Sequence, residues 1–67
     1  MRSTVEALMY ELRTYGIAAI AGPSCQRRLS ELSPDRVREV IERLDRLRPK
    51  YPAISDNLLL ALAELIP

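Results

Sequence analysis

The chain has 67 residues, a net charge of +1, one cysteine and no histidine. This length allows at most one small domain, residues 1–67, and the cysteine and histidine counts exclude an internal disulfide and argue against a structural zinc site. The near-neutral charge gives no electrostatic reason to expect nucleic acid or a membrane as the partner, and no apolar run approaches the ~20 residues of a membrane span.

The first predicted helix covers residues 4–15. Ser3 and Glu6 have the spacing of a capping box, in which the serine side chain accepts a backbone N–H of the first turn. Gly16 is suited to end the helix because glycine adopts the left-handed conformation easily. The apolar residues recur at the spacing of one helical face, and they are Val5, Leu8, Met9, Leu12 and Tyr15.

Residues 17–21 form a short run of apolar side chains bounded by Gly16 and Gly22. We interpret this run as a buried linker or irregular turn, with a single extra helical turn as the alternative. A phosphate-binding loop is not expected, because the run lacks both the Gly-Lys-Ser/Thr and the GxGxxG pattern.

The second predicted helix covers residues 23–32 and places Cys25, Leu29 and Leu32 on its inner face. A nucleophilic cysteine needs a base, and the chain has no histidine to supply one. Cys25 is therefore expected to be a small buried apolar side chain.

The third predicted helix, residues 34–48, is the best specified segment, and we expect the others to pack on it. Ser33 is a preferred N-cap residue and Pro34 fits the first helical position. Pro49 disfavours helical geometry in the residue before it. The apolar face consists of Val37, Val40, Ile41, Leu44 and Leu47. The opposite face predicts ion pairs at i,i+4 spacing, namely Arg38–Glu42, Glu39–Arg43 and Glu42–Arg46.

The connection that follows contains two prolines around Tyr51 and should be stiff. We expect the Tyr51 ring to pack on a helix end with its hydroxyl in water, and contact between Tyr51 and a binding partner is the alternative. The last predicted helix covers residues 56–66 and is capped by Ser55. Its inner face is formed by Leu58, Leu62 and Leu65, whereas Leu60 falls on the opposite side.

Together these segments predict an all-α fold, a compact bundle of four short helices without strands. The core should be aliphatic, because the chain contains no Phe or Trp. The residues expected to be buried together are Leu8, Leu12, Leu29, Val37, Ile41, Leu44, Leu58 and Leu62. Small domains of this kind often need a partner chain, since they bury only about 60% of their unfolded surface.

Catalysis is not expected from this sequence. The acidic residues lie along helix surfaces at salt-bridge spacing with arginines, and histidine, the commonest proton shuttle, is missing. We expect neither a metal nor a cofactor. The single cysteine and the lack of a visible signal peptide indicate a reducing, cytoplasmic location.

The pattern favours a protein-binding module that docks on a larger protein or forms a homodimer, because the last helix carries a surplus leucine. The small size, the arginine content and the helical character also resemble small phage or mobile-element proteins, which often inhibit a host complex, although no motif carries this resemblance. The residues expected to contact the partner are Leu60, Ala61, Ala63, Glu64, Arg27, Arg28, Arg36, Arg43 and Tyr51.

The alternative is a nucleic-acid-binding regulator of the helix-turn-helix type. Residues 27–50 hold eight basic and five acidic side chains. The candidate basic patch consists of Arg27, Arg28, Arg36 and Arg43. Against this alternative, the turn between the second and third helices lacks glycine, and the exposed face of the third helix carries acidic residues that would repel phosphate.

Overall fold

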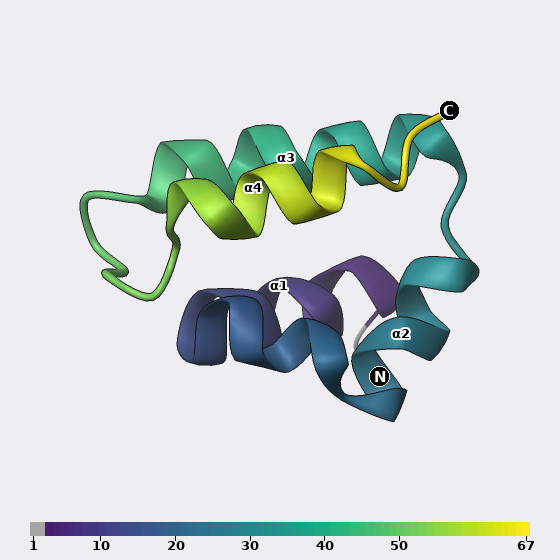
Figure 1. The fold of residues 1–67 in the computed structure, drawn as a ribbon, viewed down its shortest axis with the longest axis horizontal. Coiled ribbons are helices and arrows are strands. Elements are labelled where there is room, and N and C mark those ends of the chain that lie inside the picture. The colour runs from purple at the N-terminus through teal and green to yellow at the C-terminus, as the bar shows by residue number, and fades with distance from the viewer. Residues whose placement is uncertain (1–2) are drawn as a thin grey trace.

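The computed structural model describes residues 3–67, and within this range the chain forms α-helices and no strand (Figure 1). The elements in chain order are α1 (Thr4–Tyr15), the 3-10 helix η1 (Gly16–Ala21), α2 (Pro23–Ser30), α3 (Pro34–Leu47) and α4 (Asp56–Ala63). The predicted all-α bundle of four short helices is confirmed. The longest described helix has 14 residues, and none of these helices is long and apolar enough to cross a membrane.

All four helices begin where the sequence predicts, and a serine caps three of them. The hydroxyl oxygens of Ser3, Ser33 and Ser55 each accept the backbone N–H three residues later, at 3.2, 3.3 and 3.2 Å. Each of these hydrogen bonds satisfies a backbone donor that the first turn leaves without a partner.

The predicted end of α1 is confirmed, and the other three helices end earlier than predicted. Helix α2 ends at Ser30 instead of residue 32, α3 at Leu47 instead of 48, and α4 at Ala63 instead of 66. In each case the next turn tightens, and its N–H groups bond to carbonyls three residues back at 3.0–3.4 Å. Such tightening is a common way to satisfy the last carbonyls of a helix.

The interpretation of residues 17–21 as a buried linker or irregular turn is wrong, because the chain continues from α1 into the 3-10 helix η1. The alternative, a further helical turn, describes this segment better. Only Gly16 is buried in this element, and the residues after it are exposed or half-buried. Gly16 has a φ of +65°, and a Cβ atom built on it would lie 2.5 Å from the carbonyl oxygen of Ala53. This glycine therefore allows both the turn out of α1 and the close approach of the α3–α4 connection.

The helices form two layers, with α3 beside α4 in one layer and α1 beside α2 in the other (Figure 1). The apolar faces of the layers meet in a core of Leu8, Met9, Leu12, Cys25, Leu29, Val40, Leu44, Ile54, Leu58 and Leu62. The predicted burial of Ile41 is wrong, because this side chain is half-buried at the edge of the core. Val37 is buried as predicted but lies outside this cluster.

The predicted i,i+4 ion pairs of α3 are also wrong. In their place the helix forms i,i+3 pairs, Arg36–Glu39 at 2.9 Å and Arg38–Asp35 at 2.9 Å. Arg43 instead reaches α1 and pairs with Glu6 at 3.2 Å. Acidic groups on other elements and in the first turn thus compete with the i,i+4 partners for each guanidinium.

The α3–α4 connection is held at one end of the bundle by polar and aromatic contacts. Arg48 lies 3.5 Å from Asp45 and also pairs with Asp56 at the start of α4. Its hydrogen bond to Asp56 is the main reason that the pKa of Arg48 is raised. The guanidinium of Arg13 lies 5.2 Å from the ring centre of Tyr51, and this contact joins the connection to α1.

Candidate functional site

Few side chains in the described part of the chain offer reactive chemistry. Residues 3–67 contain no group of histidine, cysteine or acidic residues that could hold a metal ion. Cys25 is fully buried, as predicted. Burial raises the pKa of its thiol, the carboxylate of Glu11 raises it further, and Arg28 opposes this rise. The thiol is therefore buried and not accessible from the surface.

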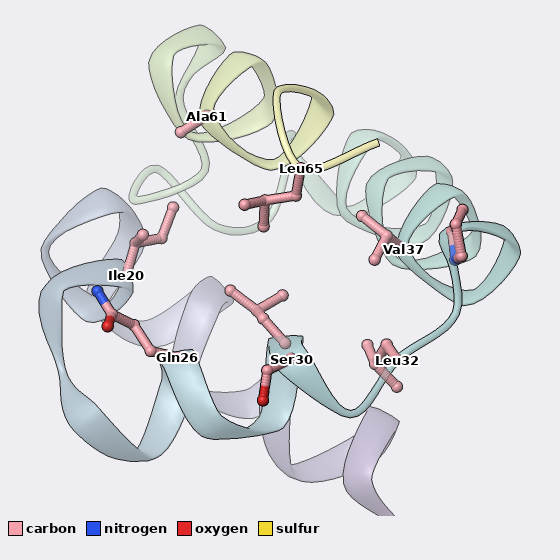
Figure 2. Close-up of a pocket in the computed structure, with 9 residues that line it drawn as sticks. Ile20, Gln26, Ser30, Leu32, Val37, Ala61 and Leu65 are labelled. Carbon is pink, nitrogen blue, oxygen red and sulfur yellow. The ribbon is translucent and has the colours of Figure 1, made fainter. Parts of the chain in front are cut away.

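The main surface feature is an open groove of about 440 Å³ between the two layers (Figure 2). Figure 2 shows η1, α2, α3 and α4 around it, with α2 and α4 on opposite sides. Six apolar side chains line it, namely Ile20, Leu29, Leu32, Val37, Ala61 and Leu65. The groove is large enough for apolar side chains of another molecule, and its size is within the range of ligand-binding clefts.

The groove carries no charge, although 28% of the residues in the chain are charged. Its remaining lining residues are Gln26, Ser30 and Pro34. The hydroxyl of Ser30 already donates a hydrogen bond of 2.7 Å to the carbonyl oxygen of Arg27. A partner that fills the groove would therefore meet apolar surface with two neutral polar groups at one bank.

The groove exists because α2 is held to α1 and η1 and does not close onto α4. The hydroxyl of Ser24 donates to the Glu11 carboxylate at 3.1 Å, and Arg28 of α2 pairs with the same carboxylate. These partly buried contacts hold the eight-residue α2 against α1. Its other face, which includes Leu29, is left beside the opening between the layers.

Helix α4 forms one bank of the groove and also carries the exposed Leu60. Ala61 lines the groove, whereas Leu60 is 63% exposed. Successive residues turn by about 100° around a helix, so these two side chains point in different directions from α4. Ala63 and Glu64 are exposed as well. The predicted exposure of Leu60 is confirmed, and its role in binding stays a prediction.

Leu65 differs from its predicted position on the buried face of the last helix. It lies beyond the end of α4, is 52% exposed and lines the groove. The N–H of Glu64 still bonds four residues back, to the carbonyl of Leu60, but the N–H of Leu65 bonds three residues back, to Leu62, so the regular helical wheel no longer applies from Leu65 onward. The sequence feature that indicates the groove is thus Leu65, an apolar residue in a turn, and helical periodicity does not predict the direction of such a side chain.

The four arginines of the predicted basic patch are distributed over separate contacts. Arg28 pairs with Glu11 and Arg43 with Glu6. Because Glu6 and Glu11 are five residues apart on α1, they point about 140° away from each other. Arg36 pairs with Glu39 and lines, together with Arg43, a small hollow of mixed charge at the start of α1.

Arg27 is the member of the predicted patch that has no ion-pair partner within residues 3–67. It is exposed on the second helix. Three of the four positive charges are therefore largely compensated inside the molecule, and one remains available to a partner.

Tyr51 is half-buried and packs against the core at the end of the bundle, as predicted. One guanidinium, that of Arg13, lies 5.2 Å from the ring centre of Tyr51 and 5.7 Å from that of Tyr10. Tyr51 lies near the α3–α4 connection and is not part of the groove lining. It is thus separate from the other predicted contact residues on α2 and α4.

The chain was compared with protein family models, with curated proteins and with solved structures, and none of them matches it. The geometry of the groove and its surroundings is therefore the basis for assigning a function.

Proposed function

We propose that this chain is a small protein-binding module that has no catalytic activity of its own. The observation that carries this proposal is the uncharged apolar groove between α2 and α4, next to the exposed Leu60. An apolar hollow beside an exposed leucine is typical of a surface that another protein covers. Amphipathic helices commonly bind in grooves of this kind.

The partner is a larger protein or a second copy of the chain. Inhibition of a host complex would be one instance of such docking, and that idea rests on small size and arginine content alone. The buried thiol of Cys25 is compatible with a reducing compartment such as the cytoplasm.

The nucleic-acid alternative receives less support from the charges on the surface. Arg28, Arg36 and Arg43 already pair with carboxylates. Phosphate contacts would have to replace these pairs, and binding would then depend strongly on salt. A gel-shift assay with double-stranded DNA and single-stranded RNA at low and moderate salt tests this alternative. A salt-dependent shift that is lost on charge reversal of Arg28 and Arg43 would favour it over the protein-binding module.

Site-specific photo-cross-linking tests the protein-binding module directly. A photoreactive residue replaces Ala61 in the groove, and the control replaces Glu42, an exposed residue of α3 outside the groove. Irradiation in a cell lysate is expected to give a protein adduct with position 61 and not with position 42. Adducts that form equally at both positions, or at neither, would contradict the proposal.

Leu60→Asp provides the second measurement. Burial of one leucine side chain contributes about 1.5–3 kcal/mol, so this substitution should weaken binding at least about tenfold. The helical signal and the melting temperature should stay nearly unchanged, because Leu60 is mostly exposed. An unfolded Leu60→Asp protein would place Leu60 in the core, and normal binding would mean that the interface does not include Leu60.

A further inference from the structure

We propose that the groove receives helix α4 of a second copy of this chain, and that the two copies form a symmetric dimer. This inference rests on the proposed function and specifies its partner. The apolar side chain that enters the groove is Leu60 of the opposite copy. The inference stands on three properties of the described surface, which are its shape, its lack of charge in the groove and two charges beside it.

The shape of the molecule supplies both halves of such a contact. Helix α4 lines the groove with Ala61 and presents Leu60 about 100° away around the helix. When α4 of the first copy lies in the groove of the second copy, a two-fold axis between the two α4 helices also places α4 of the second copy in the groove of the first. The contact is then the same on both copies and closes after two chains.

The chemistry of the two surfaces also matches. The groove lining has no charged residue, and Leu60 is followed by Ala61 and precedes Ala63 by three positions. The small side chains of Ala61 and Ala63 let α4 approach closely. Of the charged residues within about 40° of Leu60, Asp56 is already paired with Arg48, and Glu64 is the acid that the contact itself uses. The exposed fraction of 63% makes Leu60 the most exposed of the large apolar side chains in the described residues.

Two charges beside the groove make this pairing self-complementary. Arg27 on α2 and Glu64 after α4 are exposed, and neither has an ion-pair partner within residues 3–67. Helical geometry places Arg27 about 60° from Ser30 and Glu64 about 60° from Ala61. Ser30 and Ala61 line opposite banks of the groove (Figure 2).

In the dimer, α4 of one copy lies between α2 and α4 of the other. Its Glu64 then faces the α2 bank, where Arg27 is located, and the two-fold axis repeats this pair on the other side. Glu31 follows the end of α2 and lies about 40° farther from the groove than Arg27, and it forms no ion pair with Arg27 within residues 3–67. One positive and one negative charge per chain therefore match twice across the contact.

Sedimentation equilibrium of the full chain over a range of concentrations tests the proposal, with circular dichroism to establish that each variant folds. The wild-type chain is expected to dimerise. Arg27→Glu places two carboxylates against each other at both junctions, and Glu64→Arg places two guanidinium groups there. Each variant alone should raise the dissociation constant at least about tenfold.

Mixing the two variants gives the decisive result. In a heterodimer of Arg27→Glu with Glu64→Arg, both junctions again join one positive and one negative side chain. Two chains that dimerise poorly alone should therefore associate with each other about as tightly as the wild type. The matched controls are Arg46→Glu and Glu42→Arg, which change exposed charges of α3 outside the groove, and both should dimerise normally.

Three outcomes would overturn the dimer. They are a wild-type chain that stays monomeric at about 1 mM, single variants that dimerise as well as the wild type, and a mixture that does not recover association. The mass of the photo-cross-linked adduct at position 61 distinguishes failure of the dimer proposal from failure of the proposed function. An adduct of two chains supports the dimer, whereas an adduct with a different protein rejects it and retains the protein-binding module.

Discussion

At one end of the bundle, α1, η1 and the α3–α4 connection lie together (Figure 1), whereas α2 and α4 lie on opposite sides of the groove (Figure 2). The tight end has a glycine whose absent side chain makes room for the Ala53 carbonyl. It also has the guanidinium of Arg13 over the Tyr51 ring and the pairing of Arg48 with two acids.

Within residues 3–67, the open end has no comparable ion pair or ring contact between its two banks. Two polar side chains of α2, Ser24 and Arg28, are directed to α1, where they bind Glu11. Apolar side chains on the two banks, such as Leu29 and Leu65, line a hollow instead of filling it. The two layers thus lie in close contact where polar and aromatic side chains of one layer bind the other. They leave apolar surface exposed where such side chains bind within their own layer.

The largest expected difference between the two regions concerns a core leucine and a groove leucine. Leu44 is fully buried, and Leu65 is 52% exposed. Leu44→Ala should lower the free energy of unfolding by about 2–5 kcal/mol, whereas Leu65→Ala should change it by no more than about 0.5 kcal/mol. Urea denaturation followed by circular dichroism measures both. Equal losses would mean that the groove is filled in solution and that the two regions do not differ.

The next largest effect concerns the tight end alone. Gly16→Ala forces a side chain into a positive φ and against the Ala53 carbonyl, so the cost should be about 1–3 kcal/mol. Gly22→Ala is the matched control, because Gly22 has an ordinary φ of −75° and a Cβ there would lie 3.2 Å from the Ala19 oxygen. Thermal melts of the two variants compare them. A Gly16→Ala protein that melts at or above the temperature of the control would show that the end is less tightly packed than described.

The smallest effect is a pH dependence that reports on the attachment of α2. Because burial raises the pKa of the Cys25 thiol, the unfolded chain releases this proton at a lower pH than the folded chain does. The stabilising contribution of the protonated Cys25 thiol is complete below the ordinary thiol pKa of about 8.5. It is lost as the pH rises through the pKa of this thiol in the folded chain. Stability should therefore decline above about pH 8.5.

The Cys25→Ala variant should lack this part of the alkaline decline, and the slope of stability against pH is the quantity to compare. Urea titrations between neutral and alkaline pH provide it. Rapid alkylation of the wild-type thiol under native conditions would contradict the description, because it would mean that α2 opens readily from the core.

Local chemistry made much of this fold predictable from the sequence. The starts of α1, α3 and α4 depend on a serine and a backbone N–H three residues away, and such a short-range contact can be recognised without the tertiary structure. The buried Leu12 and Leu58 and the exposed Leu60 follow from helical periodicity in the same way. Proline and glycine, which act on their own backbone, marked most boundaries to within three residues.

Other features were decided by the tertiary structure, because they depend on groups far apart in the chain. Arg43 pairs with Glu6, which is 37 residues away, and not with its acidic neighbours on α3. Residues 17–21 became part of a 3-10 helix, and Gly16 approaches Ala53 only because the α3–α4 connection returns to that place. The groove itself is a space between elements, and its size is set by how far α2 is held from α4. A pattern of residues along one helix carries no information about that separation.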